Sequence, residues 1–580
     1  MNSKKANRLL YPILILSAVL SCKKTVNNTN NNNGTVPDTT VTITPPHENP
    51  LAATIGFFGN DWSAKTFSAP PFTIANKPTA TADATITVDM SNIITRVPKY
   101  VFGNNSNLWM GQIVNQSALT NYITDLSPNI IRGPGGSISD IYFWNASTAP
   151  SDVPATMYDG NGNAVAAGYW YGQNSQDWTL ALVNYYQLLQ MAKATGILTI
   201  NYAYARYGTG PTPVATAAHL AADWVRYDNG RTKYWEIGNE DNGNWEASYQ
   251  IDVSKNHDNQ PQIITGDLYG QHFKIFADSM RAAAQQIGAT IFIGAQLLDA
   301  EAPSWADATD KTWNQGVLTQ AGNTADFFII HDYFTPYNTN STASDILSSA
   351  LTVPSNAINY VKQQLTQYGV STKPVALTEW NIFATGSKQM VSNVAGIHAV
   401  MTLGELIKNQ FGEASRWDLA NGWSNGDDQG MFNIGDEPNA AAWNPRPAFY
   451  HMYYFQKYFG DKMVDVTVAP NAGILSYASS FSSGESGIVV VNTGTAAKTV
   501  KINIKNFRFG TNYYWYTLTG GSDNGEFSGA VFVNGIGPSN STGGPSNYAT
   551  IKANAAAIQN NIMIAMPGRS VSFIAVENQK

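Results

Sequence analysis

Eight short apolar runs alternate with longer amphipathic segments between residues 99 and 419, and this alternation constrains the fold more than any other feature of the sequence. Each run has the length and apolar character of a strand that is buried on both faces of a parallel sheet. The expected strands are residues 99–103, 129–132, 197–202, 233–238, 290–294, 327–331, 375–378 and 414–419.

The segments between these runs carry apolar residues at the spacing of one helix face. The expected helices are residues 178–195, 214–227, 269–287, 355–368 and 394–408. Eight strands that alternate with helices predict an α/β fold, a closed (β/α)8 TIM barrel rather than an open sheet. We expect this barrel domain to span residues 82–458.

The helical pattern ends near Tyr458, and short strands separated by Gly, Ser and Asn turns follow it. These strands are expected at residues 474–479, 486–493, 499–507, 513–517, 549–551 and 570–576. They predict a C-terminal all-β sandwich domain over residues 459–580. Residues 84–90 alternate apolar and polar side chains as a strand does, and pairing with this domain would explain why they precede the barrel.

The N-terminus has the parts of a secretory signal, which are positive charge, a short apolar core and a cleavage site. Lys4, Lys5 and Arg8 supply the charge, and the apolar stretch 9–20 is too short to span a bilayer. The sequence around Cys22, the only cysteine of the chain, resembles a bacterial lipobox in which the thiol carries a lipid. We therefore expect residues 1–22 to be a lipoprotein signal peptide; the alternative is an ordinary signal peptide with an incidental cysteine.

Residues 23–81 follow as a disordered tether, rich in Asn, Thr and Pro, and an N-terminal extension, in which order is expected to begin near residues 52–74 or at Ala82. Lys23, directly after the cysteine, resembles the residue found in lipoproteins that are sorted to the outer membrane. The sequence thus predicts a cell-envelope protein that meets the membrane through its lipid. It leaves open whether the protein faces the periplasm or the outside, and it leaves the oligomeric state open.

Composition excludes several classes of partner and cofactor. The net charge is −7 and no basic run occurs after the N-terminus, so no nucleic-acid binding is expected. The seven histidines show no zinc-binding spacing and no phosphate-binding loop occurs, so neither a metal nor a cofactor is predicted. The acidic, Gly-rich stretch 422–430 is interpreted as a loop rather than a calcium site.

Two glutamates follow strands on opposite sides of the predicted barrel. Glu240 comes after the fourth expected strand, in Gly238-Asn239-Glu240, and Glu379 comes after the seventh, in Thr378-Glu379-Trp380. Active sites of such barrels lie at the carboxyl ends of the strands, so the two side chains are expected to face each other. A protonated and an ionised carboxyl group in one site is what the hydrolysis of a glycosidic bond requires.

The Gly-Asn-Glu motif, together with a glutamate that ends strand seven, resembles the clan A glycoside hydrolases. The resemblance implies that Glu240 is the acid/base, that Glu379 is the nucleophile and that Asn239 binds the 2-hydroxyl of the sugar. It also implies a retaining double displacement, with the two carboxyl groups about 5 Å apart.

Two further motifs extend this resemblance over the barrel. His331 and Tyr333 end the sixth strand, where clan members often carry His-x-Tyr with the Tyr bonded to the nucleophile. The stretch that begins at Arg132 (Arg-Gly-Pro-Gly-Gly) is similar to Arg-x-Pro-Gly-Gly of the family 51 α-L-arabinofuranosidases. The resemblance makes all three residues substrate-binding or nucleophile-binding; the alternatives are barrel-rim side chains and an ordinary Gly-rich turn.

One position departs from the family 51 pattern. Asn107 stands where those enzymes usually carry the glutamate that binds arabinofuranose, which leaves the sugar specificity open. Asn107, Trp380, Trp417 and Gln429 are also expected to contact substrate, with core packing as the alternative for Trp417.

The two glutamates are expected to differ in protonation. Arg132 and Tyr333 should keep Glu379 ionised, and the negative charge of Glu379 should raise the pKa of Glu240. This predicts an activity optimum on the mildly acidic side, at roughly pH 5 to 7.

The leading hypothesis is a retaining glycoside hydrolase that degrades a plant or algal poly- or oligosaccharide, as an α-L-arabinofuranosidase-like enzyme. One alternative is an endo-β-glycanase on the same barrel, because loop lengths do not separate a pocket from a cleft. Others are a lyase or transglycosidase, and a non-catalytic glycan-binding surface lipoprotein. The β domain is expected to be a packing partner of the barrel rather than a glycan-binding module.

Overall fold

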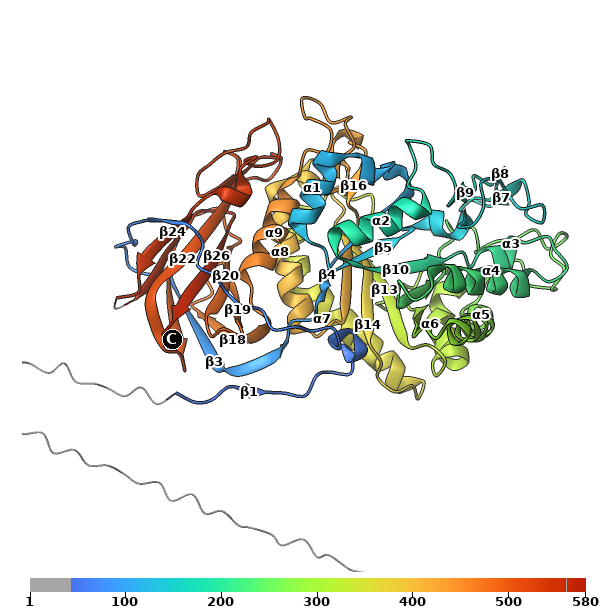
Figure 1. Cartoon of the computed structure of the whole chain (residues 1–580), viewed down its shortest axis with the longest axis horizontal. Coiled ribbons are helices and arrows are strands. Elements are labelled where there is room, and N and C mark those ends of the chain that lie inside the picture. Colours follow the sequence, from blue (N-terminus) through green and yellow to red (C-terminus); the bar gives the residue numbers. More distant parts are fainter. Residues whose placement is uncertain (1–42, 560, 580) are drawn as a thin grey trace, which may run out of the picture. The chain divides into compact units, whose positions relative to one another are not determined.

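The eight expected strands close into one parallel barrel, as Figure 1 shows. The computed structural model describes residues 43–559 and 561–579, so the predicted signal peptide and Cys22 lie outside the described residues. The barrel strands are β4 (Tyr100–Asn105), β5 (Ile130–Gly133), β10 (Thr195–Ile200), β11 (Tyr234–Ile237), β12 (Phe292–Gln296), β13 (Phe327–Tyr333), β14 (Val375–Asn381) and β15 (Glu413–Arg416). Each strand pairs in parallel with the next, and β15 pairs with β4 to close the barrel. The predicted barrel is confirmed.

Helices follow most of the barrel strands. They are α1 (Ser117–Leu126), α2 (Leu182–Ala192), α3 (Tyr204–Tyr207), α4 (Pro213–Asp228), α5 (Gly266–Ile287), α6 (Ala308–Ala321), α7 (Ala343–Gln367), α8 (Asn393–Lys408) and α9 (Pro447–Tyr458). The sequence pattern did not predict α1, α3, α6 or α9, and it placed the start of α7 too late because Pro354 lies inside this helix. Within residues 43–559 and 561–579, no helix is both long and apolar enough to cross a membrane.

The floor of the barrel is closed by a segment that precedes all of its strands. Phe57 and Phe58 belong to a short 3₁₀ turn, η1 (Gly56–Gly59), and their rings pack on Tyr234 and Phe327 at the amino ends of β11 and β13. Phe58 is fully buried. This part of the segment predicted to be a disordered tether and extension is therefore built into the fold, because its aromatic residues fill the bottom of the barrel.

The C-terminal region forms one curled sheet. Its strands are β18 (Lys462–Ala469), β19 (Ile474–Ser480), β20 (Ser486–Asn492), β21 (Lys498–Lys505), β22 (Phe509–Gly520), β23 (Val531–Val533), β24 (Ala553–Ala557), β25 (Ile562–Met566) and β26 (Ser570–Asn578), joined by β1 (His47–Glu48), β2 (Phe72–Ile74) and β3 (Ala84–Arg96). β3 lies between β18 and β21, antiparallel to the first and parallel to the second. Ile86 of β3 and Trp515 of β22 share one apolar core although their strands are far apart in the sheet order, so the sheet curls around this core as a sandwich. A strand was expected at residues 549–551, but these lie in the turn η7 (Tyr548–Thr550) and next to it, and β24 follows.

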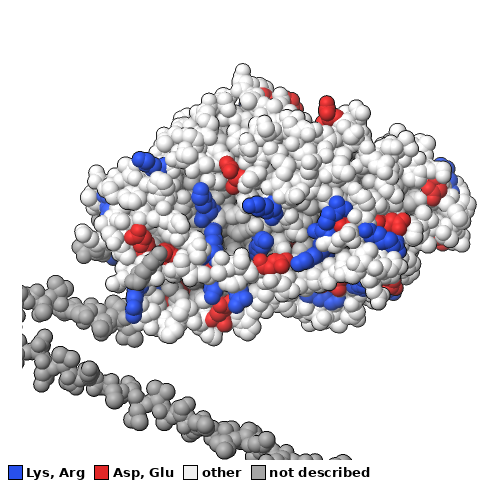
Figure 2. All heavy atoms as spheres, viewed as in Figure 1, with Lys and Arg blue, Asp and Glu red and all other residues white. Residues whose placement is uncertain are grey.

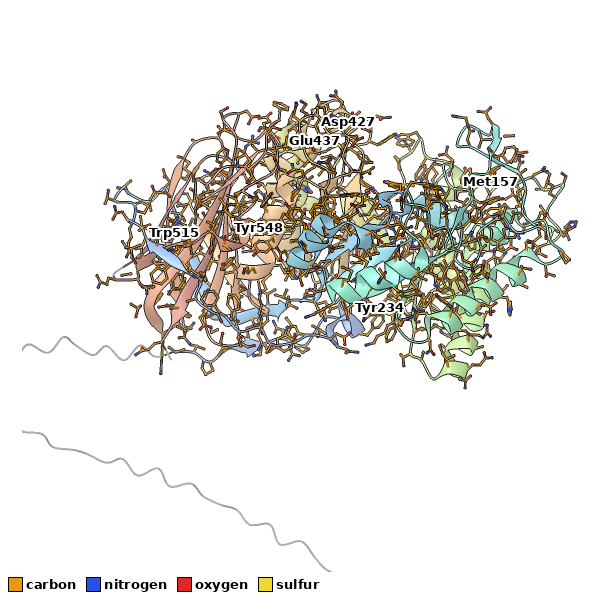
Figure 3. All side chains as sticks on the ribbon, turned by 45° about the horizontal axis from the view of Figure 1, so that its top comes forward. Met157, Tyr234, Asp427, Glu437, Trp515 and Tyr548 are labelled. Atoms are coloured by element: carbon orange, nitrogen blue, oxygen red, sulfur yellow. The ribbon has the colours of Figure 1, made fainter. Side chains whose placement is uncertain are left out.

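The other face of this sheet packs against the barrel. In Figure 1, α8 and α9 (orange) lie between the barrel and the red strands of the sheet. The ring of Tyr454 in α9 lies 4.9 Å from the ring of Tyr516 in β22. Tyr548, which is labelled in Figure 3, joins the same contact, because its ring lies 5.5 Å from the ring of Tyr450 and 5.1 Å from the ring of Tyr453. The two regions therefore share a continuous apolar interface.

The surface of the chain carries few charges. Figure 2 shows that Lys and Arg side chains lie among Asp and Glu side chains on this face, and that most of the face is uncharged. Charged residues make up 13% of the sequence, which agrees with this distribution.

Candidate active site

The two glutamates of the sequence motifs lie together at the carboxyl end of the barrel. Glu379 is part of β14, and Glu240 follows β11 after a sharp turn in which Gly238 and Glu240 adopt φ values of +76° and +45°. One carboxylate oxygen of Glu240 and one of Glu379 lie within 4.8 Å of each other, and a ring nitrogen of His331 lies within the same distance of both. The predicted carboxylate pair is thus brought together.

Both oxygens of Glu379 accept hydrogen bonds. Nη1 of Arg132 lies 2.7 Å from Oε1, and the hydroxyl of Tyr333 lies 2.7 Å from Oε2. Burial raises the pKa of Tyr333 well above its usual range, and the charge of Glu379 raises it further, so the phenol stays a donor. A guanidinium and a phenol therefore stabilise negative charge on Glu379.

Arg132 is completely buried and donates hydrogen bonds to four side chains, those of Glu236, Asn239, Glu379 and Asn105. Its Nε lies 2.5 Å from Glu236, and its second terminal nitrogen lies 2.9 Å from Oδ1 of Asn239. Burial lowers the pKa of Arg132, but the charges of Glu236 and Glu379 outweigh this effect and leave it above its ordinary value. The cation is therefore permanent, and it fixes the distance between β5, β11 and β14.

Glu240 shares a hydrogen bond with His331. Oε1 of Glu240 lies 2.8 Å from Nδ1 of His331, and Oε2 accepts a bond of 3.1 Å from the indole nitrogen of Trp245. Nε2 of His331 lies 3.0 Å from the hydroxyl of Thr378, which fixes the ring.

The protonation of Glu240 differs from the expectation. Burial raises the pKa of Glu240, but the hydrogen bond and the charge of His331 outweigh burial and leave this pKa below its ordinary value. Burial lowers the pKa of His331, and Glu379 and Glu240 together leave it raised. The expected increase for Glu240 was wrong because the sequence did not show that His331 binds this carboxyl group directly.

Asn239 is held at both ends of its amide. Its oxygen accepts the bond from Arg132, and its nitrogen donates to Oε1 of Glu246 over 2.9 Å. Asn239 therefore lies beside Glu240 with a fixed orientation, as the predicted role at the sugar requires.

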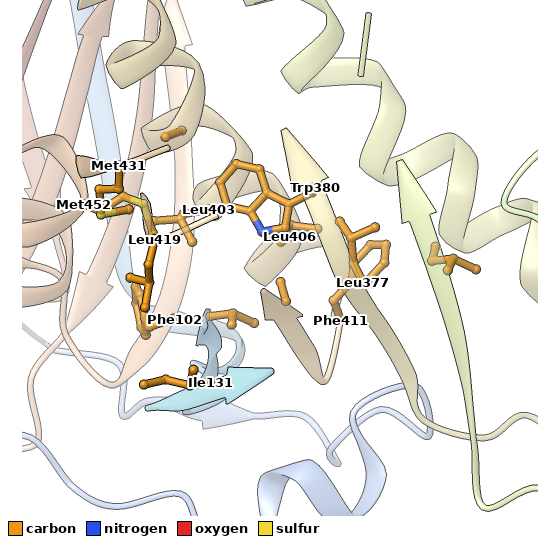
Figure 4. Packing of buried hydrophobic residues seen from close by; sticks show 14 of the residues in the cluster. Phe102, Ile131, Leu377, Trp380, Leu403, Leu406, Phe411, Leu419, Met431 and Met452 are labelled. Carbon is orange, nitrogen blue, oxygen red and sulfur yellow. The ribbon is translucent and has the colours of Figure 1, made fainter. Parts of the chain in front are cut away.

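One of the other predicted substrate contacts, Trp380, faces away from the carboxylates. Trp380 is completely buried and packs against Leu403 and Leu406 of α8, as Figure 4 shows. Neighbouring residues of a strand point to opposite faces, so Glu379 faces the barrel interior while Trp380 faces the helices. Its predicted contact with substrate was wrong for this reason.

Trp417 follows β15 and packs over the Gly-rich stretch after β5. A Cβ atom on Gly135 or Gly136 would lie 2.8 Å from its ring, so only glycine leaves room for this tryptophan. Asn107 is buried, and its amide nitrogen donates to the carboxylate of Asp418 and to the carbonyl of Ala420. The amide nitrogen of Gln429 donates a hydrogen bond of 3.1 Å to the carbonyl of Ile382.

Three residues of the site were not predicted. Glu236 binds Arg132, Trp245 binds Glu240 and Glu246 binds Asn239. All three lie within six positions of Glu240 in the sequence, so proximity to the motif was the available signal. The contacts of Trp245 and Glu246 depend on how the chain turns after β11, whereas Glu236 lies within this strand.

An open pocket lies on the Glu240 side of the site, with about 530 Å³ of empty space. Its walls include Trp245, Leu298, Asp299 and His331, and the indole of Trp245 is 59% exposed. Exposed aromatic rings next to polar side chains are suited to bind the apolar faces and the hydroxyls of a sugar.

Glu240, His331 and Glu379 are close enough together to hold a metal ion. However, Arg132 already places a positive charge 2.7 Å from Glu379, so a metal ion would meet electrostatic repulsion there. The absence of a metal remains a prediction.

Comparison with known proteins connects this site to carbohydrate-active enzymes. Residues 122–343 match the family model of the alpha-L-arabinofuranosidase 1 domain. None of the curated proteins compared with the chain matches it.

Solved structures share the fold at low sequence identity. An alpha-L-arabinofuranosidase from Thermotoga maritima, solved with arabinose, is 19% identical; the match covers 85% of this chain and 100% of the enzyme with a TM-score of 0.57. A family 51 alpha-L-arabinofuranosidase from Bifidobacterium longum is 13% identical, with coverages of 86% and 100% and a TM-score of 0.58. CelM2, a bifunctional glucanase-xylanase from a metagenome library, is 13% identical, with coverages of 86% and 100% and a TM-score of 0.55.

These neighbours are glycoside hydrolases, and the match to the family model includes Arg132, Glu240 and His331. Barrel and β domain are both covered by the structural matches. Residues 122–343 are therefore similar to an alpha-L-arabinofuranosidase 1 domain, and the chain has the fold of the family 51 enzymes, which agrees with the resemblance found in its motifs.

Proposed function

We propose that the chain is a retaining glycoside hydrolase that degrades a plant or algal polysaccharide, with Glu240 as acid/base and Glu379 as nucleophile. The distance within 4.8 Å between their carboxylate oxygens carries this proposal. Retaining enzymes place the two carboxyl groups about 5 to 5.5 Å apart, whereas inverting enzymes need about 6.5 to 9.5 Å to fit a water molecule.

The first step forms a covalent glycosyl-enzyme. Glu379, whose negative charge is stabilised by Arg132 and Tyr333, attacks the anomeric carbon and forms an ester bond to it. The bond to the leaving oxygen breaks, and Glu240 donates a proton to this oxygen. This proton comes from the pair of Glu240 and His331, which share one proton between Oε1 of the carboxyl group and Nδ1 of the imidazole.

The second step releases the sugar. Glu240, now without its proton, removes a proton from a water molecule, and the water oxygen attacks the anomeric carbon. The ester bond breaks and Glu379 regains its negative charge. The proton returns to the pair of Glu240 and His331, so the enzyme ends in its starting state.

The sugar at the cleavage point is proposed to be α-L-arabinofuranose. The match of residues 122–343 to an arabinofuranosidase domain supports this choice. Asn107 is the main departure, because its amide nitrogen already binds Asp418 and Ala420.

An endo-β-glycanase is the second candidate. CelM2 and a xyloglucanase from Paenibacillus polymyxa share the fold, the latter at 14% identity, with coverages of 85% and 99% and a TM-score of 0.53. The pocket beside Glu240 is open to solvent and offers Trp245 as a platform for the leaving sugar, which suits a chain that continues beyond the cleavage point.

Purified protein, tested beside Glu240→Ala and Glu379→Ala on aryl glycosides and on plant and algal polysaccharides, tests this proposal. We expect the wild type to release sugar with retention at the anomeric carbon, as followed by NMR of the first product. Glu379→Ala should be inactive, and azide should restore activity to Glu240→Ala by forming a glycosyl azide. An inverted first product would refute the retaining mechanism, and tight glycan binding without turnover would favour the binding lipoprotein.

We also propose that Cys22 carries the lipid that anchors the enzyme in the cell envelope, on the outer membrane. The lipobox-like sequence before Cys22 supports this proposal. Cells grown with labelled palmitate should label the wild type but not Cys22→Ser, and the variant should leave the membrane fraction. Equal labelling of both proteins would refute it.

A further inference from the structure

Glu246 is a buried carboxyl group that the proposed reaction does not use. It is 2% exposed, and its Oε1 accepts two hydrogen bonds. One comes from Nδ2 of Asn239 over 2.9 Å, and the other comes from the hydroxyl of Ser137 over 2.6 Å. Asn239 immediately precedes the proposed acid/base, so Glu246 is connected to the site through Asn239.

These contacts form a circuit that starts and ends on the same part of the chain. Arg132, at the end of β5, donates to the oxygen of Asn239. Asn239 donates to Glu246, and Glu246 accepts from Ser137, five positions after Arg132. Two hydrogen bonds therefore connect the loop after β11 to this part of the chain, one at Arg132 in β5 and one at Ser137 in the loop that follows β5.

The circuit permits one orientation of the Asn239 amide. Arg132 is a donor and requires the amide oxygen, whereas Glu246 is an acceptor here and requires the amide nitrogen. Turning the amide over would direct its N–H groups at the guanidinium and its oxygen at the carboxyl group, so both contacts would become unfavourable. Without Glu246, only Arg132 would specify the orientation.

We infer that Glu246 is a positioning residue, which fixes the Asn239 amide so that its remaining N–H is directed at the 2-hydroxyl of the sugar, and that it acts as a hydrogen-bond acceptor rather than as a charge. This inference rests on the proposed function. It extends that function by assigning a role to a residue that does not touch the substrate.

The surroundings of Glu246 support the role of a neutral acceptor. Burial raises the pKa of Glu246 well above its usual range, and the charge of Glu240 adds to this increase. Among the described residues, no lysine or arginine forms an ion pair with Glu246. A glutamine side chain has the same length and offers the same acceptor oxygen, so it should replace Glu246.

The test compares Glu246→Gln, Glu246→Met and the wild type on an aryl glycoside that the wild type hydrolyses and on its 2-deoxy analogue. Glu246→Met keeps the length of the side chain but removes the acceptor. We expect kcat/KM of Glu246→Gln to stay within about threefold of the wild type on both substrates. For Glu246→Met we expect kcat/KM to fall about 10- to 100-fold on the 2-hydroxy substrate and much less on the 2-deoxy analogue, because only the former has the hydroxyl that the Asn239 amide binds.

Thermal melting shows whether each variant is folded. If Glu246→Met does not fold, Glu246→Leu provides the same comparison, because its apolar side chain also removes the acceptor and leaves little space for water. Ser137→Ala is the matched control, because it removes the second donor and leaves the contact with Asn239 in place. It should keep the wild-type ratio of rates on the two substrates.

Three results would overturn the inference. Equal losses of Glu246→Met on both substrates would show a general structural role, and a loss for Glu246→Gln as large as that for Glu246→Met would show that the charge matters. A folded, acceptor-free variant with wild-type rates on both substrates would show no role. Failure of the proposed function is distinguishable, because the wild type itself would then hydrolyse neither substrate.

Discussion

Nδ1 of His331 lies 2.8 Å from Oε1 of Glu240, so the proposed acid/base shares its proton with an imidazole. The pKa of Glu240 is lowered and that of His331 is raised, although burial acts in the opposite direction on each. One proton therefore belongs to the pair over the pH range in which the enzyme is expected to work.

The pH dependence of kcat/KM should report this pair. The pKa of His331 is raised above its ordinary value of 6.5, so the pair of Glu240 and His331 loses its last proton above pH 6.5. We therefore expect kcat/KM to fall as the pH rises through this raised pKa. In His331→Gln the proton rests on Glu240 alone, and the basic limb should move to lower pH. His219→Gln is the control, because the His219 side chain is 71% exposed. An unchanged basic limb in His331→Gln would contradict the shared proton.

The phenol of Tyr333 should contribute to the stabilisation of Glu379. Tyr333→Phe removes one of the two hydrogen-bond donors to Glu379 and keeps the ring that stacks on Phe383. We expect kcat/KM to fall about 10- to 100-fold, since hydrogen bonds to charged groups contribute about 1.5 to 3 kcal/mol. Tyr337→Phe should have no effect, because Tyr337 is 72% exposed and packs on the edge of the same Phe383 ring. Similar rates for Tyr333→Phe and wild type would contradict this role.

Arg132 should matter for stability as well as for activity. Arg132→Met leaves the buried carboxyl groups of Glu236 and Glu379 without their cation. Breaking a buried ion pair in this way costs about 3 to 5 kcal/mol of unfolding free energy, measurable by denaturant titration at neutral pH. Arg226→Met removes an exposed ion pair with Asp223 and should cost about 0 to 1 kcal/mol. Equal losses in the two variants would argue against the buried network.

The indole nitrogen of Trp245 should assist the acid/base. Trp245→Phe keeps an aromatic ring in the pocket but removes the donor 3.1 Å from Glu240. We expect a loss of about tenfold in kcat/KM on natural glycosides and a smaller loss on aryl glycosides with good leaving groups, which need less protonation. Trp305→Phe is the control, because Trp305 is 85% exposed and does not line this pocket. Equal losses on both kinds of substrate would exclude an effect through Glu240.

Gly136 and Gly369 both have a positive φ, but they differ in the space around them. Both glycines have φ near +68°, but a Cβ atom on Gly136 would lie 2.8 Å from Trp417, whereas one on Gly369 would meet nothing within 4 Å. Gly369→Ala should cost about 1 to 2 kcal/mol for the left-handed backbone. Gly136→Ala should cost about 1 to 3 kcal/mol more and should also lower activity, because Trp417 must move and because the ψ of −168° at Gly136 is almost confined to glycine at a positive φ. Equal melting temperatures would show that Trp417 adapts freely.

The barrel could be predicted because buried parallel strands form short apolar runs that local sequence reveals. α6 was missed because its sequence is largely polar and shows little helical periodicity, and α7 was shortened because Pro354 suggested a helix start. The two catalytic candidates came from motifs at strand ends. Trp380 was misassigned because a tryptophan next to a catalytic glutamate suggests a sugar platform, whereas the alternation of β14 directs it into the core. The bond between His331 and Glu240, and the role of Glu246, depend on contacts between loops that no single segment contains.

The position of β3 has a consequence for the order in which the protein is made. This strand leaves the ribosome before any strand of the barrel. The short β1 precedes it and pairs with its end at Asn92 and Ile93, but β18 and β21, which flank Ile86 and Val88, begin only at Lys462 and Lys498. Its apolar residues Ile86 and Val88 therefore have no neighbouring strand beside them until the whole barrel has been synthesised. A ribosome that stalls between the barrel and β18 would leave a nascent chain with this strand exposed, which is a site for a chaperone or for aggregation.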